Sequence, residues 1–265
     1  VRARYVVDAS GRDTLLAHQL DLKRRLPRHN SAAVFGHYRG AERLPGRMEG
    51  HISIFWFAHG WIWFIPLADG TTSVGAVCWP HYLKSRDKPL AEFFADTLAM
   101  APPLAERLRG AELVDGKVYA TGNYSYGAGA SSGERHLLVG DAYAFVDPVF
   151  SSGVYLAMAG AYAALPVVQA TLDGGPAAAT TVAARRRYDA HMVKGPREFS
   201  WFIVRMTNPA MRELFMHPAN PLRMQEAVLG LLAGDLFNGT PIWRSLWCFK
   251  VLYYLTSLRM ARRGE

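Results

Sequence analysis

Cysteine is scarce in this sequence, and no metal-binding spacing is present. The 265 residues include two cysteines, Cys78 and Cys248, which lie far apart in the chain. This separation excludes a disulfide framework and a zinc site of the Cys-x-x-Cys type. The nine histidines form no His-Glu-x-x-His cluster, so we expect no metal. A chain without a disulfide framework is typical of a reducing cytoplasm, which is the location we expect.

Two motifs that would indicate a nucleotide or catalytic site are incomplete. Gly127 and Gly129 lack the third glycine of Gly-x-Gly-x-x-Gly, so they form no dinucleotide-binding fingerprint. Residues 129–133 match Gly-x-Ser-x-Gly, but they precede an expected strand instead of joining a strand to a helix. The sequence therefore predicts no hydrolase elbow there.

Acidic residues are outnumbered by basic ones, 22 against 30, which gives a formal net charge of +8. Part of the excess gathers at residues 23–25 and 185–187 and in the C-terminal tail. Such a balance suits an anionic cofactor, an acidic carrier protein or a membrane surface, although a run of this kind also forms ordinary solvated faces. No nucleic-acid motif accompanies the charge, so we expect no nucleic acid partner.

Half of the residues are apolar, which is enough for one large or two ordinary domains. A strand at 5–7 and the turn after it predict one edge of a nucleotide-binding sheet, although an ordinary strand-to-helix turn fits the same residues. A hairpin signal at Asp69-Gly70 lies among closely spaced strands, which predicts an antiparallel sheet. The expected strands are 32–38, 51–57, 60–67 and 72–77. Helices at 91–98 and 102–109 come next, and then a strand at 117–126 that returns to the first sheet.

The stretch from 137 to 153 is the centre of the interpretation. A short buried strand ends at Gly140-Asp141, and a loop stiffened by Pro148 then leads through Ser152 and Gly153 into a long apolar helix. The unpaired N–H groups and the positive dipole end of such a helix attract anions. This stretch therefore predicts an anion or phosphate site.

The helix itself is uncharged from 153 to 172, which is long enough to span a membrane. Gln169 and Pro166 interrupt it, and its many small residues suit close packing, so we expect a buried helix and no transmembrane segment. The chain continues as helices at 180–202, 221–233 and 241–260. The last of these is amphipathic, and it is expected to dock on the body, with a partner or peripheral membrane contact as alternatives.

Three segments taken together resemble the flavin-dependent halogenases. Trp61, Trp63, Ile65 and Pro66 match the Trp-x-Trp-x-Ile-Pro signature of that family. Asp8, Gly11 and Arg12 are similar to a turn of the FAD-binding domain. Gly140 and Asp141, with Asp147, Pro148, Gly153 and Val154, resemble the second flavin motif. The resemblance covers roughly residues 4 to 172.

The resemblance implies an α/β (α+β) fold with a partial, Rossmann-like FAD-binding domain. The FAD-binding domain would consist of residues 1–25 and 131–175. An antiparallel-sheet substrate domain would occupy residues 26–130, and a helical C-terminal region would occupy residues 176–265. It implies bound FAD, reduced by a separate flavin reductase. A flavin hydroperoxide would then convert chloride or bromide, held by Ser152 and Gly153, to hypohalous acid. Trp61 and Trp63 would separate the flavin from the organic substrate.

Two departures from the family accompany this resemblance. The first Gly-x-Gly-x-x-Gly motif and the lysine that relays the oxidised halogen are both absent, so we expect the downstream part of a halogenase, unable by itself to hold FAD firmly. Phe150 stands where tryptophan halogenases have a glutamate, which favours a phenolic, pyrrolic or carrier-tethered substrate. A flavin monooxygenase of the same fold and a non-catalytic remnant remain the alternatives.

Overall fold

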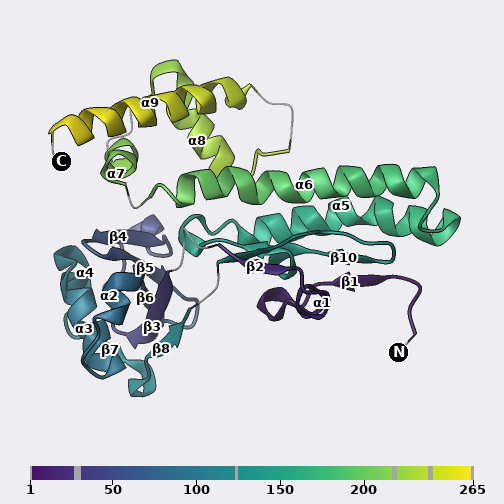
Figure 1. Cartoon of the computed structure of the whole chain (residues 1–265). Coiled ribbons are helices and arrows are strands. Elements are labelled where there is room, and N and C mark those ends of the chain that lie inside the picture. Colours follow the sequence, from purple (N-terminus) through teal and green to yellow (C-terminus); the bar gives the residue numbers. More distant parts are fainter. Residues whose placement is uncertain are drawn as a thin grey trace. The chain divides into compact units, whose positions relative to one another are not determined.

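The computed structural model describes residues 2–26, 31–122, 125–206, 208–216, 220–237 and 241–263. The chain has a mixed α/β fold, as the sequence predicts, and divides into two compact units (Figure 1). Residues 29–124 form one unit, which we call the sheet unit, where the sequence suggested 26–130. Residues 1–28 and 125–265 form the other, which we call the parallel-strand unit because it contains a parallel pair of strands. The C-terminal helices therefore group with the segments that resemble a flavin domain.

The sheet unit is built on an antiparallel sheet of six strands in the described residues. Their order is β4-β5-β6-β3-β7, with β8 paired to β3. The bounds are β3 (Ala32–Arg39), β4 (Ser53–Phe57), β5 (Gly60–Pro66), β6 (Thr72–Cys78), β7 (Glu112–Leu113) and β8 (Tyr119–Thr121). The four strands predicted between 32 and 77 are confirmed, because alternating apolar residues bounded by turn residues specify a strand locally.

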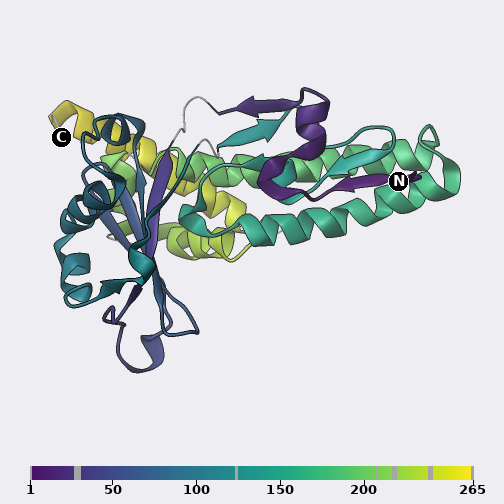
Figure 2. The same ribbon diagram turned by 90° about the horizontal axis from the view of Figure 1, so that it is seen from below.

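Helices cover one face of this sheet, as Figure 2 shows. They are α2 (Pro80–Lys84), α3 (Leu90–Ala99) and α4 (Pro102–Arg107). Ile62 and Phe64 of β5 are fully buried in the same core as Phe94 of α3 and Leu104 of α4. Since side chains alternate along a strand, Trp61 and Trp63 belong to the opposite face.

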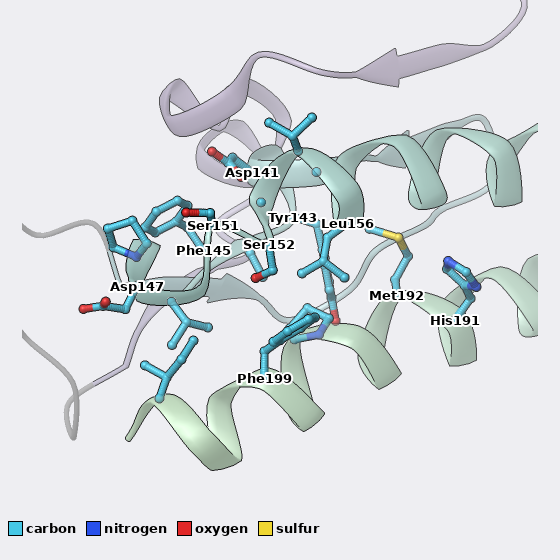
Figure 3. Close-up of a pocket in the computed structure, with 18 of the residues that line it drawn as sticks. Asp141, Tyr143, Phe145, Asp147, Ser151, Ser152, Leu156, His191, Met192 and Phe199 are labelled. Carbon is cyan, nitrogen blue, oxygen red and sulfur yellow. The ribbon is translucent and has the colours of Figure 1, made fainter. Parts of the chain in front are cut away.

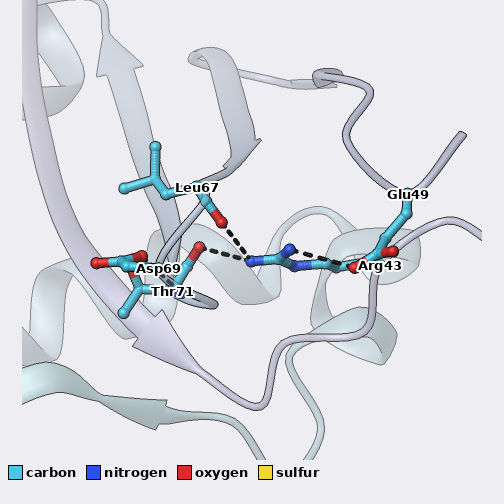
Figure 4. Close-up of polar contacts among 5 residues, drawn as sticks. All are labelled: Arg43, Glu49, Leu67, Asp69 and Thr71. Atoms are coloured by element: carbon cyan, nitrogen blue, oxygen red, sulfur yellow. Dashed lines mark hydrogen bonds and ion pairs between the residues drawn. The ribbon is translucent and has the colours of Figure 1, made fainter.

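A half-buried arginine holds the β5–β6 hairpin of the sheet unit (Figure 4). The Arg43 guanidinium donates to the carbonyl oxygens of Leu67 at 3.0 Å and Thr71 at 2.9 Å, and it pairs with Glu49 at 3.3 Å. Asp69 turns the hairpin by accepting from the backbone N–H and the hydroxyl of Thr71. One side chain from a preceding loop therefore fixes both ends of the turn.

We expect Arg43→Ala to lower the free energy of unfolding of the sheet unit by about 2 kcal/mol, because two carbonyl oxygens lose charged donors. Urea denaturation followed by tryptophan fluorescence measures this. Arg47→Ala is the matched control, since Arg47 is exposed and its loss should cost less than about 0.5 kcal/mol. Equal effects of the two substitutions would contradict the role given to Arg43.

The parallel-strand unit contains a parallel pair, β1 (Val6–Asp8) with β10 (His136–Leu138). A second, antiparallel sheet has the order β11-β9-β2. Its strands are β2 (Lys23–Arg25), β9 (Tyr126–Ala128) and β11 (Ala144–Phe145). The single strand predicted at 117–126 is wrong. The chain forms β8 on the six-stranded sheet and β9 on this one, with residues 123 and 124 outside the described residues.

Two long helices, α5 (Gly153–Gly174) and α6 (Ala179–Ile203), run side by side in both ribbon views (Figures 1 and 2). Small residues allow the approach: a Cβ on Gly160 would lie 3.0 Å from the sulfur of Met192, and one on Gly195 would lie 2.6 Å from Leu156. The helix predicted at 180–202 is confirmed within a residue at each end.

The prediction that α5 is a buried helix is wrong for one of its faces. Gly160, Ala164 and Val167 are buried, but Val154 is 74% exposed, Tyr162 71% and Leu165 62%. The small residues predict close packing on a sheet; Ala163 and Ala164 do pack in the core with Leu137, but Ala161 is exposed. Within the described ranges, α5 is the one helix whose length and composition would allow it to cross a membrane. Core helices of soluble proteins meet that criterion too.

In the described residues this unit also contains the short helix α1 (Leu15–Gln19) and the C-terminal helices α7 (Pro209–Met216), α8 (Met224–Leu232) and α9 (Ile242–Arg263). The sequence predicted α8 and α9 but did not single out α7. Helix α9 docks on the body through buried Leu246, Phe249 and Tyr253, as expected. Its other face leaves Trp247 and Leu258 more than half exposed.

Candidate functional site

The two segments that resemble flavin motifs meet at one end of the parallel strand pair. Asp8 aligns with Leu138 in the register of β1 and β10, and the Val139 N–H donates to the Asp8 carbonyl oxygen at 3.0 Å. The turn Gly11–Asp13 contacts the turn Gly140–Ala142. Ligands in open α/β sheets bind beyond the carboxyl ends of parallel strands. Asp8, Gly11, Arg12, Gly140 and Asp141 are therefore all brought to such an edge.

Both oxygens of the Asp8 carboxylate accept hydrogen bonds from the protein backbone. One oxygen accepts from the Ser10 N–H at 2.9 Å and the other from the Leu16 N–H at 2.7 Å, and the residue is buried. Burial by itself raises the pKa of Asp8, but the hydrogen bonds outweigh it, so this pKa lies below its ordinary value. Asp8 therefore shapes the turn that follows β1.

Asp141 is a contrasting carboxylate at the same edge. Burial raises the pKa of Asp141, and the nearby Arg12 guanidinium opposes this rise. Tyr126 donates to the backbone carbonyl of Asp141 at 2.7 Å, and burial raises the pKa of Tyr126 to about 12. Within the described part of the chain no group donates a hydrogen bond to the Asp141 carboxylate. Its acceptor capacity remains available for a ligand hydroxyl.

The loop after β11 delivers the chain to the start of α5. Asp147 accepts from the Val149 N–H at 3.0 Å and begins the 3-10 turn Pro148–Phe150. Ser151 then takes a left-handed conformation, with φ of 51°. Ser152 occupies the N-cap of α5 without capping any N–H through its side chain. The first-turn N–H groups of a 22-residue helix therefore face this loop, and a Cβ on Gly153 would lie 3.9 Å from an Asp141 carboxylate oxygen.

A largely apolar cavity of about 330 Å³ lies between this loop and α6 (Figure 3). Pro148, Ser152 and Gly153 line it from the loop. Figure 3 shows Leu156 of α5 and Met192 and Phe199 of α6 pointing toward the space between the two helices. Gly140, Asp141, Asp147 and Val154 also belong to its lining. The cavity therefore joins the predicted halide residues to a wall of C-terminal helices.

Trp61 and Trp63 belong to the sheet unit. Their ring centroids lie 6.0 Å apart, and the Trp63 indole N–H donates to the Ser73 hydroxyl at 3.1 Å. Trp61 is 3% exposed, and Ile65 and Pro66 are half-buried at the end of β5. The two indoles do share one face of the strand, as their alternation predicted.

Sequence reasoning missed the residues that α6 contributes to the cavity. Met192, Pro196, Phe199 and Ile203 recur at spacings of four, three and four residues, which places them along one helix face. That periodicity was visible, but nothing in it pointed to a cavity instead of a core. Phe150 packs against Phe199 and against Phe215 of α7, at centroid distances of 6.5 and 6.0 Å. Phe150 therefore belongs to an apolar cluster.

Comparison with protein families gives a match to the tryptophan halogenase family over residues 1–210. A flavin-dependent halogenase of Armillaria mellea (armH2) is 36% identical over 190 residues, which are 64% of this chain and 36% of that protein. The 1H-pyrrole-2-carbonyl-[peptidyl-carrier protein] chlorinase of Pseudomonas fluorescens is 28% identical over 90% of this chain and 53% of its own length. The chain thus spans about a third to a half of the length of the curated relatives it matches.

Two solved structures that resemble this chain are also flavin-dependent halogenases. The flavin-dependent halogenase CmlS superposes with a TM-score of 0.68 and 28% identity, over 75% of this chain and 36% of that one. The myxobacterial chondrochloren halogenase CndH, an FAD-dependent enzyme, superposes with a TM-score of 0.69 and 25% identity, over 97% of this chain and 62% of that one.

Proposed function

Because this chain belongs to the tryptophan halogenase family of flavin-dependent enzymes, we propose that it forms part of an FAD-dependent halogenase that makes hypohalous acid from chloride or bromide. The observation that carries the proposal is the convergence at one edge of β1 and β10. Asp141, the Gly11–Asp13 turn and the N-terminus of α5 meet there.

The residues at this edge fit a flavin. Gly140 has a φ of 55° and no space for a Cβ beside Ala157, so this turn position requires glycine. Asp141 would accept hydrogen bonds from flavin hydroxyls, and Pro148 would contact the ring system. Asp8 and Gly11 would hold the turn in place, and Arg12 would lie near the polar part of the cofactor. When bound and reduced, FAD supplies the electrons with which oxygen is activated to oxidise a halide.

The uncapped N-terminus of α5 would hold the halide. Backbone N–H groups of a helix N-terminus point outward and carry about half a positive charge together, which suits a monovalent anion. Ser152 and Gly153 lie at this end and line the cavity. Trp61 and Trp63 would separate the oxidising chemistry from organic substrate, so that a halide is oxidised in preference to carbon.

The substrate would be an aromatic, phenolic or pyrrolic ring, free or tethered to a carrier protein. The 1H-pyrrole-2-carbonyl-[peptidyl-carrier protein] chlorinase matches 90% of this chain. A separate flavin reductase in the same cytoplasm would supply reduced FAD. The net charge of +8 favours an acidic carrier protein. Peripheral membrane contact by the exposed face of α9 is a further proposal.

The test compares Ser152→Asp with Ser152→Asn in the whole gene product. Both side chains are good N-caps, and they differ only in charge. We expect the aspartate to raise the KM for chloride about tenfold relative to the asparagine, because a carboxylate within about 4 Å repels a halide by about 1 kcal/mol or more. Steady-state chlorination at increasing chloride concentration measures this.

Two other outcomes of the same assay would count against the proposal. An oxygenated product formed without any halide would identify a flavin hydroxylase. A protein that takes up no flavin when FAD is added would be a non-catalytic remnant. Equal KM values for the two variants, in an enzyme that does chlorinate, would place the halide away from the α5 N-terminus.

A further inference from the structure

Helix α9 presents a row of exposed apolar side chains on the face that does not dock. The helix contacts α7 and α8 (Figure 1), and its buried residues are Leu246, Phe249 and Tyr253. The exposed row consists of five apolar or aromatic residues, which are Trp247, Val251, Tyr254, Leu255 and Leu258. Their spacing places them along one side of the helix, away from the buried residues. A contiguous exposed apolar patch of this kind marks an interaction surface.

Basic side chains border this row, and no acidic residue belongs to α9. Lys250 is directed to the body of the unit, because its ammonium pairs with Glu198 of α6 at 2.9 Å. The other four basic residues of the helix are exposed and form no ion pair within the described part of the chain: Arg244, Arg259, Arg262 and Arg263. Their charge therefore remains available to an anionic partner.

The aromatic members of the row are suited to a boundary between water and an apolar phase. Tyr254 is half exposed, and its hydroxyl accepts a hydrogen bond from the Arg205 guanidinium at 3.0 Å. The same guanidinium lies over the Trp201 ring, 4.5 Å from its centroid, so Tyr254 is held in place from the protein side. Tyrosine and tryptophan have an apolar body and a polar tip, and both are enriched where a membrane meets water. Trp247 and Tyr254 thus stand where such a boundary would lie.

The combination of charge and apolar surface favours a lipid bilayer over a protein. From Trp247 to Leu258 the row runs for about 16 Å along the helix axis. Helices with leucine and tryptophan on one side and arginine beside them lie in the plane of membrane interfaces. A second copy of this chain would bring arginines against arginines. An acidic protein would match the arginines alone, whereas anionic headgroups above an acyl layer match both the arginines and the apolar row.

We propose that the exposed face of α9 binds the surface of a membrane that contains anionic phospholipids. The apolar row would enter the boundary between headgroups and acyl chains, and the arginines would extend their apolar stems toward the headgroup phosphates. Five basic side chains keep the helix along the surface and prevent it from crossing. None of the described residues of α9 lines the cavity given to flavin and halide, so this binding requires neither ligand.

The experiment measures co-sedimentation of the purified chain with two kinds of vesicle, without flavin or halide. One kind is phosphatidylcholine alone, and the other is phosphatidylcholine and phosphatidylserine in equal parts. We expect the partition coefficient to be at least about tenfold higher for the mixed vesicles. Leu258→Ser should lower binding to them about fivefold, because an apolar side chain no longer leaves water. Leu258 is 60% exposed, so circular dichroism should show an unchanged fold.

A matched control distinguishes α9 from the other exposed apolar helix face. Leu165 of α5 is 62% exposed, and Leu165→Ser makes the same chemical change there. It should alter vesicle binding less than about twofold, the ordinary effect of a surface change. An equal loss in both variants, or a loss in Leu165→Ser alone, would overturn the assignment to α9.

A second pair of variants tests the charge. Arg259→Gln with Arg262→Gln should lower binding to the mixed vesicles about tenfold or more, since each basic residue near an anionic surface contributes about a factor of five. Arg186→Gln with Arg187→Gln removes the same charge from exposed positions of α6. That control should have less than about a threefold effect, because salt screens charges that stay away from the surface.

Three results would overturn the proposal. The first is a wild-type chain that does not bind the mixed vesicles. The second is binding that needs the arginines but is unchanged in Leu258→Ser, which would be the electrostatic contact that an acidic protein also makes. The third is a dimer in gel filtration that Leu258→Ser dissociates, which would show that a second copy covers the row. A chain that binds vesicles but never chlorinates would leave this inference standing and refute the proposed function alone.

Discussion

Replacing Gly140 by alanine is expected to lower the free energy of unfolding of the parallel-strand unit by about 2–4 kcal/mol. Gly140 has a φ of 55°, and a Cβ there would lie 2.8 Å from the Cβ and 3.3 Å from the Cα of Ala157. The left-handed conformation costs an alanine about 1 kcal/mol, and the overlap with a packed helix adds about 1–3 kcal/mol. Urea denaturation of the purified chain measures the loss.

Two control variants separate strain from overlap at Gly140. Gly11 has a φ of 65°, but a Cβ at that position would have nothing within 4 Å, so Gly11→Ala should cost only about 1 kcal/mol. Ala157→Gly removes one of the overlapping atoms. The Gly140→Ala and Ala157→Gly pair should therefore be less destabilising than the sum of the two changes by about 1 kcal/mol or more. Simple additivity would show that α5 moves away without resistance.

We expect Gly140→Ala to weaken ligand binding as well as to lower the free energy of unfolding. Gly140 precedes Asp141, and Ala157 belongs to the second turn of α5, the helix that carries Ser152 and Gly153 at its start. Pushing α5 away from this turn would separate the carboxylate from the helix N-terminus. We expect flavin and halide binding to fall together in Gly140→Ala, whereas Gly11→Ala should weaken mainly the flavin side.

Replacing Gly75 by alanine is expected to lower the free energy of unfolding of the sheet unit by about 3 kcal/mol. Gly75 faces Trp63 across β5 and β6, and a Cβ there would overlap the indole ring. The ring has little freedom to move, because it donates to Ser73 and packs 6.0 Å from both Phe35 and Trp61. Overpacking of this kind costs about 1–3 kcal/mol, sometimes more. Urea denaturation followed by tryptophan fluorescence measures it.

A double-mutant cycle tests whether Trp63 is the cause. In a Trp63→Ala background the overlap is gone, so Gly75→Ala should become neutral or slightly stabilising, since alanine loses less backbone entropy than glycine in a strand. A cost that persisted without the indole would assign the role of Gly75 to the backbone instead. Gly75→Ala alone should also shift the emission of Trp63 by displacing it toward water.

The site could be predicted in part because its components are local. A glycine at an αL turn, an aspartate after a strand and a Ser-Gly helix start each leave a signal within a few residues. These signals, together with the family resemblance, make Gly140, Asp141, Ser152 and Gly153 candidate site residues. The indole pair of Trp61 and Trp63 follows from strand alternation in the same way.

The two wrong predictions, the strand at 117–126 and the burial of α5, have a different origin. Residues 117–126 carry an acceptable strand pattern, but a pattern does not say with which sheet a strand pairs, and the chain divided the segment between two sheets. The apolar composition of α5 predicted burial, but the number of faces that are covered depends on neighbours far away in the sequence. His191 was one of nine scattered histidines until α6 placed it against Phe237 and in the wall of the cavity that Ser152 and Gly153 also line.

The sequence by itself determined the four strands of the sheet unit between 32 and 77 and the helix that begins at Gly153, and it suggested the residues that could receive a flavin and a halide. Only the tertiary structure decided that the Asp8 carboxylate accepts hydrogen bonds from its own turn, whereas the Asp141 carboxylate accepts none within the described residues and could bind a ligand. It also decided that α6 closes a cavity onto Ser152 and Gly153. The physical reason is range: backbone conformation follows from neighbouring residues, whereas burial, hydrogen-bond partners and cavities depend on which distant segments come into contact.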